Sequence, residues 1–346
     1  MKKNKTKKIR LPLTFVLAVS LSLLTIACKP VLEPDQDLQI WYLKIGIAPN
    51  SYGVYRANAD MTNSIQVVSD GLINDVHPVF NSKVNTPDGV IVDLEGGKVY
   101  WTNMNYISGS GDNAHGGSVA RANLDGSDVE FVIPPGDDII RPKQITMDFE
   151  NRKLYWSDRE GASVWRCNPD GSELERIVDW SDEDVEAHQF VGIAVDPDNN
   201  KFYWTDRKAN NIHSASMDVM GIGKADTDSY TTIVSGLNAP IDLILNSDGS
   251  TIYFTERGKG DELIGGCRTC GSVRSADTGS FSTSEDTTLL VGGMEGVGID
   301  IDEISGRIFY SEIGGQIGSV NLDGTDHTII TDTGALLTTG IDLVRP

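Results

Sequence analysis

The sequence VYWTN at residues 99–103 recurs along the chain, with the same order of residue types each time. Its other copies are LYWSD at 154–158, FYWTD at 202–206, IYFTE at 252–256 and IFYSE at 308–312. The first aromatic residues of successive copies lie 55, 48, 50 and 56 positions apart. A period of about 50 residues is typical of one four-stranded blade in a β-propeller. The repeat therefore predicts an all-β fold in which blades follow one another along the chain.

Each copy of the motif has a strand signal before it and a turn signal after it. The preceding signal is a short apolar run such as GVIV at 89–92, followed by a polar residue seven positions before the first aromatic. These polar residues are Asp93, Asp148, Asp196, Asn246 and Asp302. The later signal, clearest in three of the copies, is Asn-x-Asp-Gly-Ser/Thr, in which glycine accepts the positive φ of a tight hairpin. We therefore expect four strands per blade, with the apolar run innermost.

The two ends of the repeat region supply the strands of a sixth blade. Residues 339–344 (TGIDLV) form an inner-strand pattern, and residues 39–44 (QIWYLK) form an aromatic strand with no inner strand before it. Residues 53–59 and 65–69 complete this blade, so that it takes three strands from the N-terminal side. Pairing of these segments closes the ring and leaves no free sheet edge between the first and last blades. The six-bladed propeller is therefore expected over residues 38–346, about 52 residues per blade.

At these positions the sequence resembles the low-density lipoprotein receptor class B family, whose YWTD repeats build six-bladed β-propellers. The aromatic pair, the Thr or Ser, the acidic residue and the downstream Asp-Gly turn recur in register. The fourth and fifth copies are altered, at Phe254 and at Phe309-Tyr310, and the sixth blade lacks the Thr-Asp pair. By analogy the resemblance implies binding of protein ligands, although a fold does not by itself define a function. We expect the repeated residues to be structural, and function to lie where the repeats differ.

Residues 1–27 have the pattern of a bacterial lipoprotein signal peptide. Six basic residues among the first ten are followed by an apolar run over residues 11–27. The segment LTIAC, which ends at Cys28, resembles the lipobox, whose cysteine becomes the lipidated N-terminus, although Thr25 replaces the usual Leu. This predicts acylation of Cys28, a short tether over residues 28–37, and a membrane partner through the lipid anchor, outside the cytoplasm in the bacterial cell envelope. A plain secretory signal and an uncleaved anchor are the alternatives.

The charge distribution limits the classes of partner. The chain has 50 acidic and 29 basic residues, and removal of residues 1–27 changes the net charge from −21 to −27. Nucleic-acid binding needs clustered Lys and Arg, and the one such cluster in the sequence lies in the segment expected to be removed. We therefore expect no nucleic-acid partner, and an acidic domain that tolerates cationic ligands or divalent metals.

Four long segments break the symmetry of the repeats. They are residues 69–86 and 179–189 between blades, and residues 104–116 and 257–271 after aromatic strands. In a propeller both kinds of connection open on one face, so this face is the expected site for a protein or small-molecule ligand. Its candidate ligand-binding residues are Asp112, Asn113, His115, Asp182, Glu183, Asp184 and His188. The same residue types are also common in turns and in solvated acidic segments.

Three aspartates, Asp242, Asp300 and Asp342, interrupt inner strands where other blades carry neutral residues. Carboxylates that line a six-bladed channel hold calcium in lactonase-type propellers, so a calcium-dependent hydrolase or lactonase is the alternative function. The sequence contains no phosphate-binding glycine loop, no Gly-x-Ser-x-Gly and no His-Glu-x-x-His, and it identifies no catalytic residue. A binding or interaction scaffold is therefore the favoured function, with no cofactor firmly implied and calcium as the possible ion.

Two cysteines lie close together in the segment over residues 257–271. Cys267 and Cys270 are separated by two residues. Outside the cytoplasm we expect a disulfide between them, with half of a zinc site as the alternative. Cys167 occupies a strand position and is expected to be a small buried apolar residue.

Overall fold

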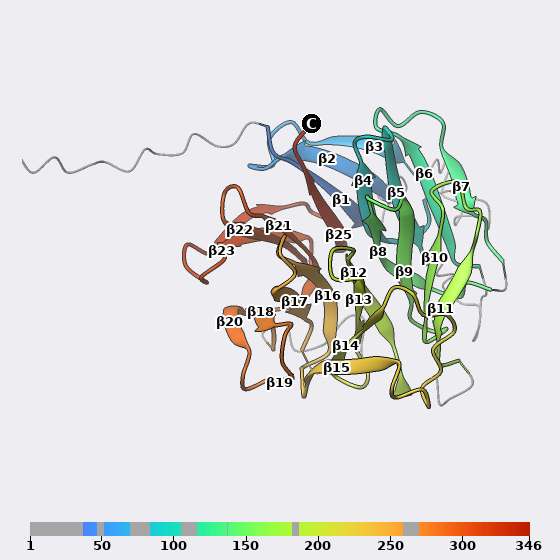
Figure 1. Cartoon of the computed structure of the whole chain (residues 1–346). Helices are drawn as coiled ribbons and strands as arrows, with labels where there is room; N and C mark the ends of the chain where they lie inside the picture. The colour runs from blue at the N-terminus through green and yellow to red at the C-terminus, as the bar shows by residue number, and fades with distance from the viewer. Residues whose placement is uncertain are drawn as a thin grey trace, which may run out of the picture. The chain divides into compact units, whose positions relative to one another are not determined.

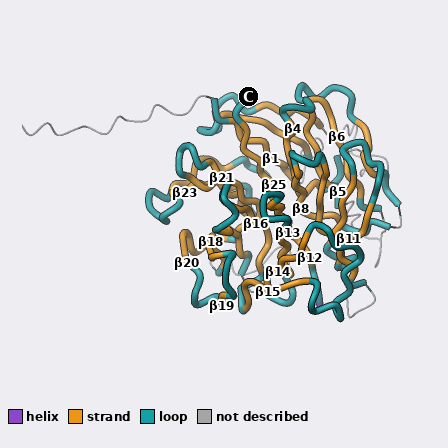
Figure 2. Tube along the Cα trace, viewed as in Figure 1, coloured by secondary structure: helices purple, strands orange, loops and turns teal. Residues whose placement is uncertain are grey.

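The computed structural model describes residues 37–46, 52–69, 84–104, 116–136, 138–181, 187–258 and 270–346. Within these ranges the chain forms 25 β-strands and no α-helix (Figure 2). The strands build six sheets that are arranged in a ring (Figure 1). The predicted all-β six-bladed propeller is therefore confirmed. Among the described residues, no helix is long and apolar enough to cross a membrane.

Each of the first five blades contains an inner strand, the aromatic strand that carries the motif, and two outer strands. In chain order they are β4 (Pro87–Asp93), β5 (Lys98–Asn103), β6 (Ser118–Asn123) and β7 (Glu130–Ile133); β8 (Pro142–Asp148), β9 (Lys153–Asp158), β10 (Ser163–Cys167) and β11 (Glu175–Asp179); β12 (Phe190–Asp196), β13 (Lys201–Asp206), β14 (Asn211–Ser216) and β15 (Tyr230–Ser235); β16 (Pro240–Leu245), β17 (Thr251–Glu256), β18 (Gly271–Asp277) and β20 (Thr288–Met294); and β21 (Gly296–Asp302), β22 (Arg307–Glu312), β23 (Gln316–Asn321) and β24 (Thr328–Asp332).

Blade 6 closes the ring in the predicted way. Its inner strand is β25 (Leu337–Val344), which pairs antiparallel with the aromatic strand β1 (Gln39–Ile45). The outer strands β2 (Gly53–Asn58) and β3 (Ile65–Ser69) follow in the same sheet. One chain segment near each end of the propeller therefore contributes to the same blade.

Blade 3 has a fifth strand that the sequence did not predict. The two-residue strand β19 (Ser282–Thr283) lies between β18 and β20 in sequence but pairs in parallel with β15, where Val234 faces Ser282. The connection between the outer strands of blade 4 thus crosses to the outer edge of blade 3. This pairing covers part of an edge that would otherwise be open.

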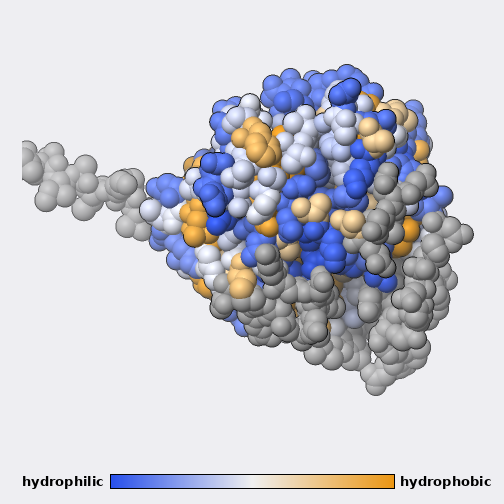
Figure 3. Space-filling model, turned by 90° about the horizontal axis from the view of Figure 1, so that it is seen from below, coloured by the Kyte–Doolittle hydropathy of each residue, from blue (hydrophilic) through white to orange (hydrophobic). Residues whose placement is uncertain are grey.

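The aromatic residues of the motif fill the spaces between blades, as expected. At each of the six interfaces, the first aromatic of one blade lies in the same buried cluster as the second aromatic of the next. The pairs are Trp41 with Trp101, Tyr100 with Trp156, Tyr155 with Trp204, Tyr203 with Phe254, Tyr253 with Tyr310, and Phe309 with Tyr42. On the face shown in Figure 3, hydrophobic residues lie in small separate groups among hydrophilic ones.

The Thr and Ser hydroxyls of the motif join neighbouring inner strands. Thr205 Oγ1 accepts a hydrogen bond from Gly192 N in its own blade (2.7 Å) and donates one to Ile241 O of the next blade (2.7 Å). Thr102, Thr255 and Ser311 make equivalent bonds. Blade 6 has lost this hydroxyl, but Thr339 on its inner strand donates to Pro87 O of blade 1 instead (3.0 Å). The ring is therefore linked by buried hydrogen bonds at its closure as well.

Candidate functional site at the two mouths of the channel

The six inner strands surround a channel that has a pocket at each end. We call one end the loop mouth, where the aromatic strands finish, and the other the turn mouth, where the inner strands turn into the aromatic strands. The loop-mouth pocket has a volume of about 210 Å³ and the turn-mouth pocket about 550 Å³. Two of the four long segments meet at the loop mouth, where Met104 N at the start of residues 104–116 donates to Thr86 O at the end of residues 69–86 (3.1 Å).

Six equivalent positions form a ring around the loop mouth, one from each blade. Each is the residue directly after the motif, and in blades 1 to 5 its N–H donates to a carbonyl in the segment that leads into its own inner strand. In blades 2, 3 and 4 the residue is Arg159, Arg207 and Arg257. In blades 5, 6 and 1 it is Ile313, Ile45 and Met104. Half of the ring is therefore cationic and the other half apolar.

Lys143 on β8 adds a fourth cation to the loop-mouth pocket. Its Nζ lies 3.5 Å from Asp88 Oδ2 on β4, and only 7% of each side chain is exposed. Burial, reinforced by the positive charge of Arg159, lowers the pKa of the Lys143 ammonium to about 8. Burial also lowers the pKa of Arg257. The pocket therefore holds buried positive charge that desolvation makes less favourable.

Two of the arginines are held in place by polar neighbours. Arg159 Nε donates to Glu160 Oε1 (2.7 Å), and Arg207 Nη1 donates to Gln189 Oε1 (2.5 Å). Glu160 also pairs with Arg141 (3.2 Å), so that its charge is shared between two guanidinium groups. Despite burial, the positive charges of Arg159, Lys143 and Arg141 lower the pKa of Glu160, which offsets part of the charge in this half of the ring.

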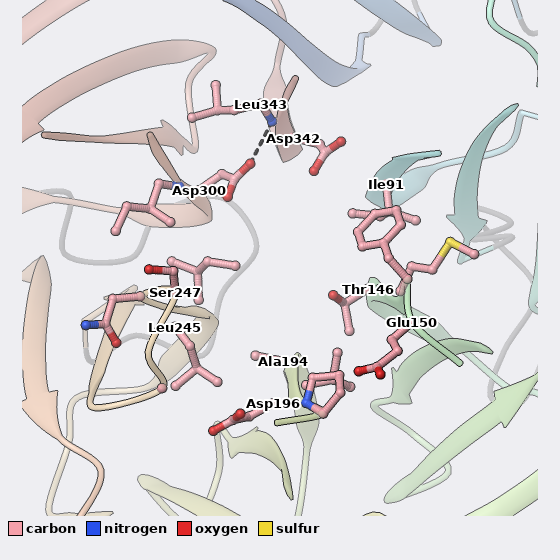
Figure 4. Close-up of a pocket in the computed structure, with 18 of the residues that line it drawn as sticks. Ile91, Thr146, Glu150, Ala194, Asp196, Leu245, Ser247, Asp300, Asp342 and Leu343 are labelled. Atoms are coloured by element: carbon pink, nitrogen blue, oxygen red, sulfur yellow. Dashed lines mark hydrogen bonds between the residues drawn. The ribbon is translucent and has the colours of Figure 1, made fainter. Parts of the chain in front are cut away.

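The turn mouth has the opposite charge. Five carboxylates line its pocket, and the lining contains no Lys, Arg or His among the described residues. Figure 4 shows Asp300 and Asp342 on neighbouring strands at one side of this pocket, with Glu150 and Asp196 across it. The fifth is Asp198, in the turn after β12.

The three aspartates proposed as metal ligands join blade to blade. Each accepts a hydrogen bond from an inner-strand N–H of the next blade: Asp242 from Ile299 (3.1 Å), Asp300 from Leu343 (2.6 Å) and Asp342 from Val92 (2.9 Å). The described residues contain no group of three or more His, Cys, Asp or Glu side chains that could hold a metal ion. Each of these carboxylates therefore links its own blade to the inner strand of the next.

Burial has a large effect on the same three groups. It raises the pKa of Asp300 to about 7 and raises the pKa of Asp242 and of Asp342 well above the usual range. The charge of Asp300 adds to the effect on Asp342. Desolvation disfavours the charged form of a carboxyl group, so these side chains retain protons at pH values where exposed aspartates are ionised.

Most of the other predicted site residues lie outside the described part of the chain, and His188 is buried. Asp112, Asn113, His115, Asp182, Glu183, Asp184, Cys267 and Cys28 lie outside the described residues. His188 is 6% exposed, its Nδ1 lies 2.5 Å from Asp206 Oδ2, and its ring packs edge-on against Trp180. Its expected place on the ligand face is therefore wrong, because the ring is bound into the interface between blades 2 and 3.

The remaining cysteines fit their expected environments. Cys270 is disulfide-bonded, and Cys267, which the sequence pairs with it, is outside the described residues. Cys167 is a free thiol with no exposed surface. Burial raises its pKa to about 12, which makes it unreactive.

The sequence reasoning missed the three arginines of the loop mouth. The signal that would have found them is the residue immediately after each motif, which reads Met, Arg, Arg, Arg, Ile and Ile around the ring. Because the motif itself is symmetric, an uneven pattern at the next position marks a place where the blades are not interchangeable.

The fold, the inter-blade aromatics and the hydroxyl bridges define a six-bladed propeller built from YWTD-type repeats. No family model matches the chain. A protein of Pyricularia oryzae described as low-density lipoprotein receptor-related protein 1 is 31% identical over 314 residues, which cover 85% of this chain and 98% of that protein. The chain therefore belongs to the low-density lipoprotein receptor class B propeller family.

Other similar proteins show how widely this fold is used. A 3-hydroxyacyl-CoA dehydrogenase-like protein of Cochliobolus heterostrophus is 29% identical, over 82% of this chain and 66% of that protein. A chain in a nidogen/laminin complex matches with a TM-score of 0.65 at 15% identity, over 88% of this chain and 98% of that one. TolB from Acinetobacter baumannii matches with a TM-score of 0.60 at 10% identity, over 89% and 67%. The two structural matches, at 15% and 10% identity, show the fold alone.

Proposed function

We propose that the chain is a lipid-anchored protein of the bacterial cell envelope whose propeller is a binding scaffold, with the loop mouth as its binding site. The observation that carries the proposal is the unequal ring at this mouth. Six positions that are equivalent in the fold hold three consecutive arginines and three consecutive apolar residues. The fold alone requires no such difference, so it points to recognition of something outside the ring.

A protein partner is the first expectation. The relative from Pyricularia oryzae is described as receptor-related, and one structural neighbour was solved in a nidogen/laminin complex. Both names concern those proteins, and they support the proposal by analogy. The long segments over residues 69–86 and 104–116, whose described ends meet at the loop mouth, would enlarge a contact surface around the pocket.

Photo-crosslinking in the cell tests where a partner binds. A photoreactive amino acid placed at position 313, at the loop mouth, is expected to give protein adducts. The same amino acid at the exposed position 198, at the turn mouth, is the matched control and is expected to give none. Adducts from position 198 alone, or from neither position, would contradict the proposal.

The lipid anchor is proposed from Cys28 and the basic and apolar segments before it. The Cys28→Ser variant is expected to remain unacylated and uncleaved when cells are labelled with palmitate. Cys167→Ser is the control, because that thiol is buried and far along the chain. Palmitate incorporation into Cys28→Ser equal to that of the wild type would disprove the anchor.

The calcium-dependent hydrolase remains the alternative, because the turn-mouth pocket of about 550 Å³ is lined by five carboxylates. Carboxylate oxygens are the ligands that Ca²⁺ prefers. Calorimetric titration of the purified chain with calcium separates the two functions. Tight binding that is lost in both Glu150→Ala and Asp300→Ala would favour the hydrolase, whereas the scaffold predicts no such site.

A further inference from the structure

The loop-mouth pocket carries a local excess of positive charge in an acidic protein. Its described lining contains sixteen residues, of which four are cationic and one, Asp88, is anionic. The whole chain has a net charge of −21. A cationic pocket therefore contrasts with the acidic composition of the chain. Such a pocket attracts anions, whereas the rest of the acidic surface repels them.

Several of these cations are buried, which makes a bound anion favourable. Arg257 is 9% exposed and Lys143 is 5% exposed. Burial of a charge is unfavourable unless an opposite charge or several hydrogen bonds compensate for it. Asp88 lies 3.5 Å from Lys143, which is long for a charge-assisted hydrogen bond. Burial lowers the pKa of Lys143 and of Arg257, and at Arg257 the charge of Glu295 acts against this shift.

The other half of the pocket is largely apolar, and Asp88 of blade 1 is the one charged residue in its described lining. Ile313, Ile45 and Met104 face the arginines across the ring, and Leu336 and Leu337 extend this apolar side. A bare inorganic anion would contact the arginines and leave these apolar side chains against water. A ligand with an oxyanion at one end and an apolar group at the other would use both halves.

The size of the pocket limits the ligand further. Its volume of about 210 Å³ is below the roughly 300–1,000 Å³ of pockets for drug-sized ligands. A nucleotide or an oligosaccharide would not fit within it. A short organic acid, or a single residue of a peptide, has the right size.

We propose that the loop mouth binds a carboxylate joined to a short apolar chain, with the carboxylate on the arginines of blades 2 to 4 and the chain against blades 5, 6 and 1. The planar guanidinium groups match a carboxylate in two-point hydrogen bonding. The carboxylate can belong to a free organic acid or to the C-terminus of a peptide that ends in an apolar residue. This inference rests on the proposed binding function and names the chemistry that the site would recognise.

Calorimetric titration of the purified full-length chain tests the ligand class with four small probes. Sodium hexanoate is expected to bind saturably, and sodium acetate at least tenfold more weakly because it lacks the chain. Hexylammonium chloride, which has the chain with the opposite charge, is expected not to bind. Sodium phosphate is expected to bind more weakly than hexanoate. Equal binding of hexylammonium and hexanoate, or tighter binding of phosphate, would overturn the proposal.

Two variants test the placement of the ligand. Arg257→Gln is expected to weaken hexanoate binding about tenfold or more, since it removes a charge-assisted hydrogen bond. Arg121→Gln, which alters an arginine paired with Glu130 on outer strands, is the matched control and should change affinity by less than twofold. Ile313→Asp keeps all the arginines but places an acid in the apolar half, and it is expected to abolish binding. Unchanged affinity in Arg257→Gln or Ile313→Asp contradicts the site.

A peptide probe separates the two sources of the carboxylate. A hexapeptide that ends in Leu with a free carboxylate is compared with its C-terminal amide. Binding of the acid alone assigns the site to peptide termini, and binding of hexanoate without the peptide assigns it to free acids. If position 313 still crosslinks to a partner while neither probe binds, the carboxylate proposal fails and the scaffold function stands. If both results are negative, both proposals fail.

Discussion

The two mouths of the channel lie at opposite ends of the same six inner strands and carry opposite charge. The described lining of the loop mouth has four cations and one carboxylate, with Glu160 beside Arg159, and that of the turn mouth has five carboxylates and no cation. The strands, turns and hydroxyl bridges are nearly the same in every blade. The difference therefore comes from side chains at a few equivalent positions, which vary without disturbing the ring.

The mouths also differ in what their charges do. At the turn mouth, Asp300 and Asp342 accept hydrogen bonds from the next blade, so the carboxylates serve the fold. At the loop mouth, the arginines follow the motif in only three blades, so the ring does not require them. The fold does not need the loop-mouth arginines, whereas Asp300 and Asp342 hold neighbouring blades together. The arginines are therefore the better candidates for ligand recognition.

The largest predicted effect is a fall in stability with rising pH that originates at the turn mouth. Because the pKa of Asp300 in the folded state is raised to about 7, the folded protein binds more protons than the unfolded chain between about pH 4 and 7. Stability from this group is therefore present at acidic pH and lost as the pH rises through 7, by on the order of 3 kcal/mol. Urea unfolding from pH 4.5 to 8 measures it.

Amide substitution tests the origin of this pH dependence. The double variant Asp300→Asn/Asp342→Asn retains acceptors for the backbone N–H groups and should show a much flatter profile. Asp323→Asn, in an exposed hairpin turn where hydrogen bonds lower the carboxyl pKa, is the control and should leave the slope in place. If stability fell with pH as steeply in the double variant as in the wild type, Asp300 and Asp342 would not be the origin of the pH dependence.

The loop mouth predicts an effect of opposite sign at alkaline pH. The pKa of Lys143 is lowered to about 8, so the unfolded chain binds more protons than the folded protein above that pH. Stability should rise by about 2 kcal/mol between pH 8 and 9.5, before the tyrosines titrate. The Lys143→Met variant is expected to lack this rise in the same urea experiment. A rise of equal size in Lys143→Met would assign it to another group.

The hydroxyl bridges between the two mouths predict a smaller loss. Thr205→Val has a similar shape but leaves Gly192 N and Ile241 O without their hydroxyl partner, at a cost of about 1.5 kcal/mol. Thr231→Val on the exposed side of β15 is the matched control and should be close to neutral. Denaturant midpoints of both variants give the comparison, and equal midpoints would mean that the bridge does not contribute.

The smallest predicted effect concerns the ion pair between Arg345, which directly follows β25, and Asp302 at the end of β21. Arg345 Nη2 lies 2.6 Å from Asp302 Oδ2, and the arginine is partly exposed. Arg345→Gln should lower the free energy of unfolding by roughly 0.5–1 kcal/mol. In a double-mutant cycle, the effect should largely disappear when Asp302 is already changed to Asn. Additive losses would show that the two groups act independently.

Much of the fold could be predicted because the repeat carries it. The motif period gave the number of blades, and the patterns at 39–44 and 339–344 gave the closure between β1 and β25. Pairing of β19 with β15 could not be predicted, since two residues carry no periodicity and the pairing depends on where a neighbouring blade lies. Local sequence signals specify a strand better than its partner.

The candidate site was predicted less well for a physical reason. Asp242, Asp300 and Asp342 were correctly singled out as unusual, but their bonds go to strands 57, 43 and 250 positions away in sequence. His188 looked like a surface ligand because its neighbours in sequence are acidic, yet Asp206 and Trp180 hold it inside. The arginine half-ring was visible in the sequence once the residues after the motif are aligned.

The closure of blade 6 has a consequence for how the protein is made. Trp41 pairs with Asp342, so blade 6 cannot be completed until about 300 further residues have been synthesised. Contacts this distant along a chain form slowly. Until then β1 presents an unpaired edge, which is a target for misassociation and for proteases. A truncated product that ends before residue 337 lacks β25 and therefore cannot close the ring. Ring closure thus distinguishes complete chains from truncated ones.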